Sequence, residues 1–244
     1  MMSILYEILY RPLFNLLVFL YNTVSFSNIG IAIIILTVLI KLVFLSMSKK
    51  AIVSQKALQD LQPKIKEVQT RYKDNKEEQA KALMALYKEN KVNPMSGCFP
   101  LLIQLPILIA LYQVLLKGFD PASLSALYSF VANPGSINPM FFGLLSLAAP
   151  SKVLAILAGL AQFWQAKMMA PKKDLPGAPK SSDEYVSQAM SKQMMYFLPV
   201  FTVLISWKLP AGLALYWVVT TLFTIVQQYA IMRPVRTNKQ QDNG

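Results

Sequence analysis

One stretch of the chain decides how the rest is divided: NPMSGCFPLLIQLPI, from Asn93 to Ile107. On its N-terminal side, residues 49–97 carry eleven Lys and Arg side chains, whereas residues 98–116 carry no charge. The uncharged run is long enough to cross the roughly 30 Å of hydrocarbon in a bilayer as a helix. The change of character near Cys98 therefore predicts a water-exposed segment that leads into a membrane span.

The composition of the whole chain agrees with this division. Of 244 residues, 55% are hydrophobic and 15% are charged, whereas a soluble domain carries about 25% charged residues. The charges gather in a few segments between long apolar runs. This pattern predicts an all-α, polytopic membrane protein.

The residue types argue against an enzyme. The chain has no histidine and a single cysteine, Cys98, so the usual metal sites, histidine-based catalysis and an internal disulfide are all excluded. No GxxxxGK[ST] loop for a nucleotide is present. We therefore expect no catalytic residue, no metal and no cofactor.

Working outward from Cys98, five segments are predicted to cross the membrane as helices: 29–48, 98–117, 152–169, 193–207 and 211–231. The connecting segments are then 49–97, 118–151 and 170–192, with a tail at 232–244. Residues 207–210 leave room only for a tight hairpin between the last two helices. The apolar run 141–149 is too short to span about 30 Å at about 1.5 Å per residue.

The basic residues predict the orientation. Segments 49–97, 167–192 and 232–244 hold nineteen Lys and Arg, against four on the opposite side. The positive-inside rule places these three segments in the cytoplasm and the N-terminus outside. The same rule accounts for the net charge of +12, and no motif for sequence-specific nucleic-acid binding is present.

The basic segment 49–97 is predicted to form a helical hairpin. Apolar residues recur in it at steps of three and four, as in a coiled-coil seam: Leu58, Leu61, Ile65, Val68 and Tyr72, then Ala80, Leu83 and Tyr87. Asn75 and Glu78 have the spacing of a capping box, which predicts a turn near Asp74. The alternative is a solvated charged loop.

Residues 1–28 are apolar but are interrupted by Glu7, Arg11 and Pro12. Their large side chains recur at helical spacing, which predicts an extracytoplasmic amphipathic helix lying in the membrane interface: Ile4, Leu5, Ile8, Leu9, Leu13, Leu16, Leu17 and Leu20. A sixth span or an uncleaved signal remains an alternative.

Polar residues in the spans gather in the predicted cytoplasmic halves. All twelve acidic residues lie outside the spans, so Lys41 has no intramembrane carboxylate partner in the chain, and a charge at that depth is costly. The pattern predicts a wet groove that is open to the cytoplasm and stops partway across. We expect it to be lined by Lys41, Thr37, Gln104, Gln162, Gln165, Thr224 and Gln228.

Lys41 and the glutamines also have simpler interpretations. Lys41 is close enough to the inner end of its helix to snorkel toward the headgroups. The glutamines can form ordinary hydrogen bonds between helices.

The stretch from Asn93 to Ile107 resembles the signature at the start of the second core span in the YidC/Oxa family of membrane protein insertases. Residues 61–64 and 84–88 resemble the two arms of that family's cytoplasmic hairpin. Residues 209–217, LPAGLALYW, resemble its last hairpin. The order and spacing agree from about residue 10 to residue 233, and the length is that of a short member without the large extracytoplasmic domain.

The resemblance implies a protein of the bacterial cytoplasmic membrane that inserts and helps fold membrane proteins, alone or beside the Sec translocon, through a groove open to the cytosol. It implies nascent membrane proteins and lipids as partners, with ribosome and signal recognition particle components as further candidates. The family's groove usually carries arginine where this chain has Lys41. The tail 232–244 is only weakly basic, which makes strong ribosome binding doubtful.

Two other classes of function stay open from the residues alone. A small-solute transporter or channel would call for an intramembrane acid or internal repeats, and neither is visible. A non-catalytic assembly scaffold would work without Lys41.

Overall fold

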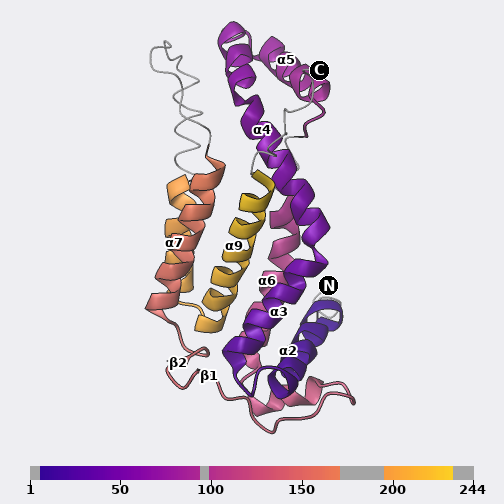
Figure 1. The fold of residues 1–244 in the computed structure, drawn as a ribbon, viewed down its shortest axis with the longest axis vertical. Helices are drawn as coiled ribbons and strands as arrows, with labels where there is room; N and C mark the ends of the chain where they lie inside the picture. Colours follow the sequence, from indigo (N-terminus) through magenta and orange to yellow (C-terminus); the bar gives the residue numbers. More distant parts are fainter. Residues whose placement is uncertain (1–5, 94–98, 171–194, 233–244) are drawn as a thin grey trace, which may run out of the picture.

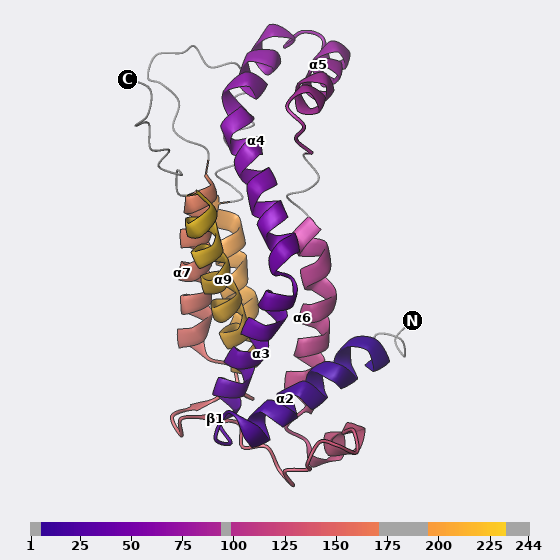
Figure 2. The same cartoon turned by 45° about the vertical axis from the view of Figure 1, so that its right-hand side comes forward.

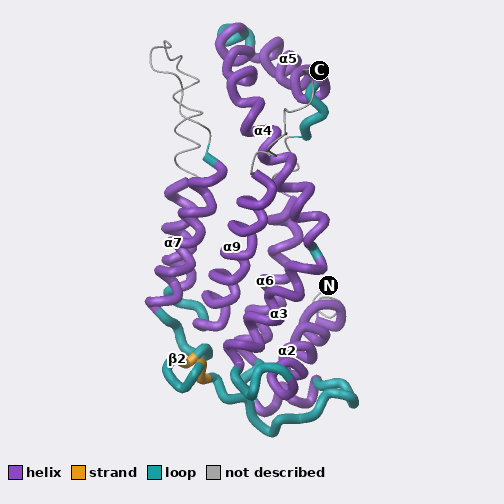
Figure 3. Tube along the Cα trace, viewed as in Figure 1, coloured by secondary structure: helices purple, strands orange, loops and turns teal. Residues whose placement is uncertain are grey.

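The structure is a computed structural model that describes residues 6–93, 99–170 and 195–232. Its described part is helical apart from two short strands, so the predicted all-α class holds with a small correction (Figures 1 and 3). The predictions for Cys98, for most of loop 170–192 and for nearly all of tail 232–244 lie outside the described residues.

The first described element is one turn of π-helix, η1 (Tyr6–Tyr10), that runs into helix α2 (Arg11–Thr23). One face of α2, which includes Phe14, Val18 and Tyr21, is buried against α3 and α6 (Figure 2). Leu17 and Leu20 of the predicted lipid-facing stripe are also buried, whereas Ile8 is exposed. Much of the apolar face of α2 is therefore covered by protein, and its position in the membrane interface stays a prediction.

Helix α3 (Ile29–Val43) starts at Asn28, whose side chain accepts hydrogen bonds from the backbone N–H groups of Gly30 and Ile31. It ends at Phe44, where α4 (Leu45–Arg71) departs at an angle of 69°. The segment 29–48, predicted as one helix, is therefore broken before its end. After this break α4 packs first on α9, α6 and α7, and its far part extends beyond the end of the other helices (Figure 2).

Helices α4 and α5 (Lys76–Glu89) form a hairpin whose turn lies at residues 72–75. The Asn75 side chain accepts from the backbone N–H of Glu78, as the capping pattern predicts. Leu61 and Ile65 are the buried members of the predicted seam. Ala80, predicted to lie in the second stripe, is exposed.

The remaining helices are α6 (Phe99–Lys117), α7 (Lys152–Met169), a helix at Met195–Ser206 and α9 (Ala211–Met232). Helix α9 packs against α7, α3, α4 and α6, so it is central to the bundle. Its first amides, of Ala211 and Gly212, donate to the carbonyls of Ala149 and Leu147. These bonds satisfy N–H groups that a helix start otherwise leaves unpaired.

Segment 118–151 closes the end of the bundle opposite the α4–α5 hairpin (Figure 1). It contains a 3-10 helix, η3 (Pro121–Ala126), and the antiparallel strands β1 (Met140–Phe141) and β2 (Leu145–Ser146). Phe141 lies against Gly30 at the start of α3, where a Cβ would stand 2.1 Å from the ring. This end of the bundle is therefore tied together by loop residues.

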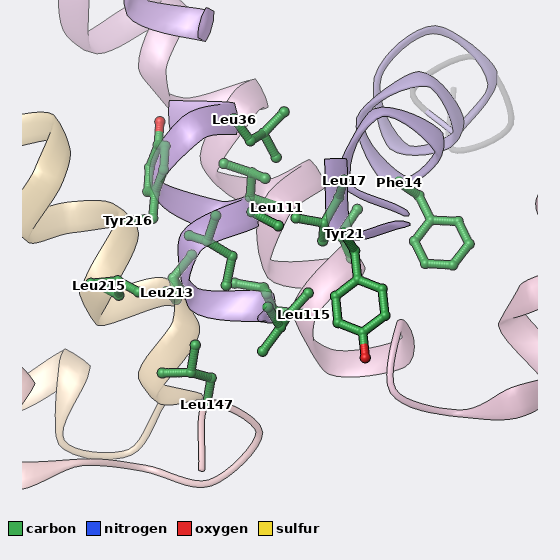
Figure 4. Packing of buried hydrophobic residues seen from close by; sticks show 14 of the residues in the cluster. Phe14, Leu17, Tyr21, Leu36, Leu111, Leu115, Leu147, Leu213, Leu215 and Tyr216 are labelled. Carbon is green, nitrogen blue, oxygen red and sulfur yellow. The ribbon is translucent and has the colours of Figure 1, made fainter. Parts of the chain in front are cut away.

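The core lies where α2, α3, α6 and the first turns of α9 meet, toward the loop end of the bundle. Figure 4 shows how Leu36, Leu111, Leu115 and Leu213 interdigitate there. At the opposite end the helices present more polar side chains to one another. The chain is thus packed dry at one end and holds its polar contacts at the other.

By length and composition, the described residues include one helix able to cross a membrane, α9, or two if the bent pair α3 and α4 counts as one span. Ile103–Lys117 and Met195–Ser206 are apolar but shorter. Many large apolar side chains on these helices are nevertheless exposed, such as Ile109, Ile156, Leu160 and Val200, as in helices that face lipid. The five-span division of the sequence stays a prediction.

Candidate functional site

Lys41 and Thr224, two of the predicted groove residues, are in contact. Helix α3 presents Lys41 toward α9, and its Nζ donates a hydrogen bond to Thr224 Oγ1 at 3.1 Å. Lys41 is only partly buried, and within the described part of the chain it forms no ion pair. Its charge is therefore held between two apolar helices by a neutral hydroxyl, with no carboxylate from the described segments beside it.

Thr37, one turn before Lys41, behaves differently. It is 1% exposed, and its hydroxyl donates to the carbonyl of Ile33 in its own helix. Such a bond satisfies the hydroxyl locally. In this structure Thr37 therefore faces protein and not a groove.

Two predicted glutamines bond across helices. Gln104 of α6 donates from its amide to the hydroxyl of Tyr216 on α9. Gln162 of α7 accepts at Oε1 from the hydroxyl of Thr202. These contacts match the simpler interpretation, in which the amides join neighbouring helices.

A cavity of about 420 Å³ opens among α4, α7, α9 and the helix Met195–Ser206. Half of its lining residues are glutamines, which come from three helices: Gln55, Gln59, Gln62, Gln162, Gln165 and Gln228. Apolar side chains complete the wall, including Leu58, Met169 and Met195. The lining is thus uncharged and half polar, half apolar, with adaptable methionines among the apolar side chains.

Gln228 has a special position in this wall. It is 2% exposed, and its Oε1 has no hydrogen-bond partner among the described residues. A buried amide oxygen without a partner is costly. The oxygen is thus an acceptor that water or a bound chain would satisfy.

The structure brings three of the seven predicted residues to this cavity, namely Gln162, Gln165 and Gln228. Lys41, Thr37, Gln104 and Thr224 do not line it. Thr224 and Gln228 are four residues apart on α9, however, so the hydroxyl partner of Lys41 lies about one turn, roughly 6 Å, farther along the helix than the cavity wall. Through Thr224, the charge of Lys41 is therefore next to the cavity wall on α9.

The sequence reading missed the contribution of α4. Gln55, Gln59 and Gln62 recur at steps of four and three, which places them on one helix face, and Gln59 Nε2 donates to the carbonyl of Ala170 at the end of α7. Ser48 of α4 likewise donates to Gln227 of α9. The spacing of these glutamines is the signal that could have identified them as a second, polar stripe beside the apolar seam.

Chemically, the site offers amides, hydroxyls and one cation. No group of three or more His, Cys, Asp or Glu side chains that could hold a metal ion occurs in residues 6–93, 99–170 and 195–232. The groups present can bind and orient a polar chain through hydrogen bonds and one positive charge.

Comparison with known proteins shows the family of the chain. The family model described as 60Kd inner membrane protein matches residues 19–240. The chain belongs to this family. The resemblance to the YidC/Oxa insertases is thereby confirmed, and membership places the chain among inner membrane proteins.

Two relatives illustrate its length. A protein of Fusobacterium nucleatum named membrane protein insertase YidC is 37% identical over 227 residues, which are 92% of this chain and 97% of that protein. A protein of Francisella tularensis subsp. novicida with the same name is 39% identical over 209 residues, 85% of this chain but 33% of that protein. The chain therefore resembles a short family member, and the insertase names agree with the expectation that it is not an enzyme.

Proposed function

We propose that the chain is a membrane protein insertase that lowers the barrier for moving a polar flank of a client protein into the membrane. The observation that carries the proposal is Lys41, a cation between α3 and α9 with a hydroxyl partner, Thr224, at 3.1 Å. The glutamine-lined cavity is close to Thr224, because Gln228 in its wall lies four residues farther along α9. The names of the relatives support the same function.

The physical argument starts from the cost of crossing hydrocarbon. A polar chain loses its hydrogen bonds to water there, at several kcal/mol for each unsatisfied group. A polar recess that reaches partway into the bundle shortens the dry path and offers replacement hydrogen bonds. Lys41 adds a transient attraction for acidic residues in the flank.

The apolar segment of the client then leaves sideways into lipid. The outward faces of α7 and of the helix Met195–Ser206 expose large apolar side chains, such as Leu160, Trp164 and Phe201. Burial of apolar surface in the membrane, at roughly 25 cal/mol per Å², drives this step. The process needs no nucleotide of its own.

The finer points of the proposal concern topology and partners. The α4–α5 hairpin and the cavity face the cytoplasm, the N-terminus and segment 118–151 face outward, and nascent membrane proteins are the clients. The Sec translocon acts beside the chain for some clients, and ribosome or signal recognition particle components meet it at the cytoplasmic side. The basic residues of 49–97 support this placement.

The experiment is reconstitution of the purified chain in sealed vesicles with a single-span client synthesised outside them. Insertion is measured as protection of the client's translocated flank from added protease. We expect protection with the chain and only background protection in empty vesicles. Equal protection in both would overturn the proposal.

A parallel measurement separates the alternatives. Leakage of small solutes from vesicles that contain the chain but no client would favour a channel. If the Lys41→Gln variant inserts every client at the parental rate, the charge of Lys41 is not needed. This result would favour the assembly scaffold, which works without Lys41.

A further inference from the structure

The loop end of the bundle exposes phenylalanines in strained turns. Phe26, in the turn between α2 and α3, is 95% exposed and has a φ of 52°. Phe142, in the turn between β1 and β2, is 64% exposed and has a φ of 49°. Bulky residues rarely adopt this left-handed conformation, which is usually left to glycine or asparagine. Strain of this kind persists only where the surrounding structure holds the residue in place, and it clusters at functional sites.

The stretches of sequence that hold these tips carry no charge of their own. Residues 121–151, a run of 31 positions, contain no Asp, Glu, Lys or Arg, and neither do residues 12–40. The same loops also expose Phe130 and Leu144, at 77% and 89%. Water-facing loops carry charges in ordinary proportion, and exposed apolar groups without charges mark a contact surface. These loops are therefore built to touch something apolar.

The depth of the loops in the membrane follows from the length of α9 and from their bonds to its first turn. The carbonyls of Leu147 and Ala149 accept from the first amides of α9, which fixes the β1–β2 hairpin at that helix end. The helix has 22 residues and so a length of about 33 Å, against about 30 Å of hydrocarbon. Its first turn then lies at one boundary of the hydrocarbon. The hairpin and the turn that holds Phe26 lie at the same end of the bundle in Figures 1 and 2.

A tryptophan marks the same level. Trp207 lies in the turn just before α9, and the Lys152 ammonium stands 5.4 Å from the centre of its ring. Tryptophan is enriched at the boundary between hydrocarbon and headgroups, and lysine reaches from there to water. The hairpin tips Phe142 and Leu144, which the bonds of Leu147 and Ala149 hold at the start of α9, therefore stand near this boundary. The turn that holds Phe26 lies at the same end of the bundle.

We propose that Phe26, Phe130, Phe142 and Leu144 form a collar that inserts into the leaflet opposite the α4–α5 hairpin. The occupant of this surface is the boundary layer of the bilayer, where aromatic rings meet both headgroups and acyl chains. The collar fixes the depth of the bundle and keeps its dry end from shifting toward water. This inference rests on the membership of the chain in an inner membrane protein family and not on insertase activity.

The test uses the full chain with Cys98 replaced by serine, reconstituted in vesicles of phosphatidylethanolamine and phosphatidylglycerol. Single cysteines replace Phe26, Phe142 or Leu144 and carry a nitroxide label. Collisions of the label with oxygen, which concentrates in lipid, are compared with collisions with a water-soluble nickel chelate. A label at Lys76, in the hairpin at the other end, is the matched control.

We expect the label to collide more often with oxygen at the three collar positions and more often with the nickel chelate at Lys76. In a Phe142→Gly variant, which fits the backbone but lacks the ring, the label at Leu144 should shift toward nickel. More frequent collisions with the nickel chelate at all three collar positions would overturn the proposal. The exposed tips would then be a contact surface for a water-soluble partner protein. The readout is depth alone, so it is independent of whether the vesicles insert a client.

Discussion

At the scale of single residues, polar side chains inside apolar helices were predictable, but their partners were not. The sequence singles out Lys41 and Thr224 separately, because each is polar in an apolar run. Their contact depends on α3 packing beside α9, which no local pattern encodes. For the same reason Tyr216, the partner of Gln104, was missed, since a tyrosine in an apolar helix gives no signal of its own.

The first prediction concerns the charge of Lys41. Arginine at this position should retain activity because it keeps the charge, whereas glutamine should slow insertion of clients with acidic flanks. An ion attraction in wet surroundings is worth about 1 kcal/mol, so the loss should be about fivefold. Initial insertion rates in vesicles measure it.

Clients with uncharged flanks provide the control for Lys41→Gln. They should insert at nearly the parental rate, because an uncharged flank gains no attraction from the Lys41 charge. An equal loss for both kinds of client, with normal protein abundance, would show that attraction of acidic flanks is not the role of Lys41.

The second prediction concerns Asn15, a buried residue that the sequence reading passed over. Its amide donates to the carbonyls of Arg11 and Ala126, and its Oδ1 accepts from the backbone N–H of Tyr128. Asn15→Ala should lower the free energy of unfolding by about 1–3 kcal/mol, since it leaves the backbone N–H of Tyr128 unpaired; the carbonyl of Ala126 keeps its bond from Arg11 Nε. Denaturant unfolding in mild detergent measures the change.

Asn22 is the matched control for Asn15. It bonds to the carbonyl of Ala132 from an exposed position, where water can replace the lost bond. Asn22→Ala should change the free energy of unfolding by about 0.5 kcal/mol or less. Similar losses in the two variants would mean that burial of Asn15 adds nothing.

At the scale of elements, the helices were predictable from apolar runs, whereas the breaks between them were not. The sequence has neither glycine nor proline near Phe44, yet α3 ends there and α4 turns away by 69°. Conversely, α4 continues through Pro63, although proline disfavours a helix interior. Packing of α4 on α9 and α7 therefore outweighs local preference in this region.

The third prediction concerns the close approach of two helices at Gly159. A Cβ there would stand 2.3 Å from Val203 Cγ2 and 3.2 Å from the carbonyl oxygen of Pro199. Gly159→Ala should therefore destabilise the protein by about 1–3 kcal/mol through overpacking, despite the better helix propensity of alanine. Unfolding in mild detergent measures the effect.

A double-variant cycle tests the cause. Val203→Ala removes the methyl group that the new Cβ would meet, so the double variant Gly159→Ala with Val203→Ala should be more stable than the sum of the two single losses predicts. Strict additivity would place the damage elsewhere in α7.

At the scale of the whole molecule, polarity is divided between two ends. The glutamine cavity and the basic hairpin lie at one end, and the charge-free loops and the dry core lie at the other. The sequence predicts this division, because amides cluster in the second half of α7 and of α9. It does not predict that α4 supplies half of the cavity's glutamines, since that depends on the bend at Phe44.

The last prediction follows from this division. Single cysteines in place of Gln162 or Gln165, with Cys98 replaced by serine, should react with a water-soluble maleimide added on the cytoplasmic side. Maleimide reacts with the thiolate, which forms only where water reaches the thiol. Cysteines in place of Ile34 or Ile156 should stay unreactive from either side, the first because it is half-buried in protein and the second because it faces lipid. A cysteine in place of Lys76 is the positive control for the cytoplasmic side.

The pattern of labelling separates three architectures. Reaction at Gln162 and Gln165 alone indicates a recess that ends partway, as proposed. Reaction at Ile34 and Ile156 as well would mean a continuous water path, which favours a channel over an insertase. Lack of reaction at all four positions, with Lys76 labelled, would mean that the glutamines only join helices, and Lys41 would then be a lysine that snorkels to the headgroups. Labelling of Lys76 from the outside alone would reverse the topology, because the basic hairpin would then face away from the cytoplasm.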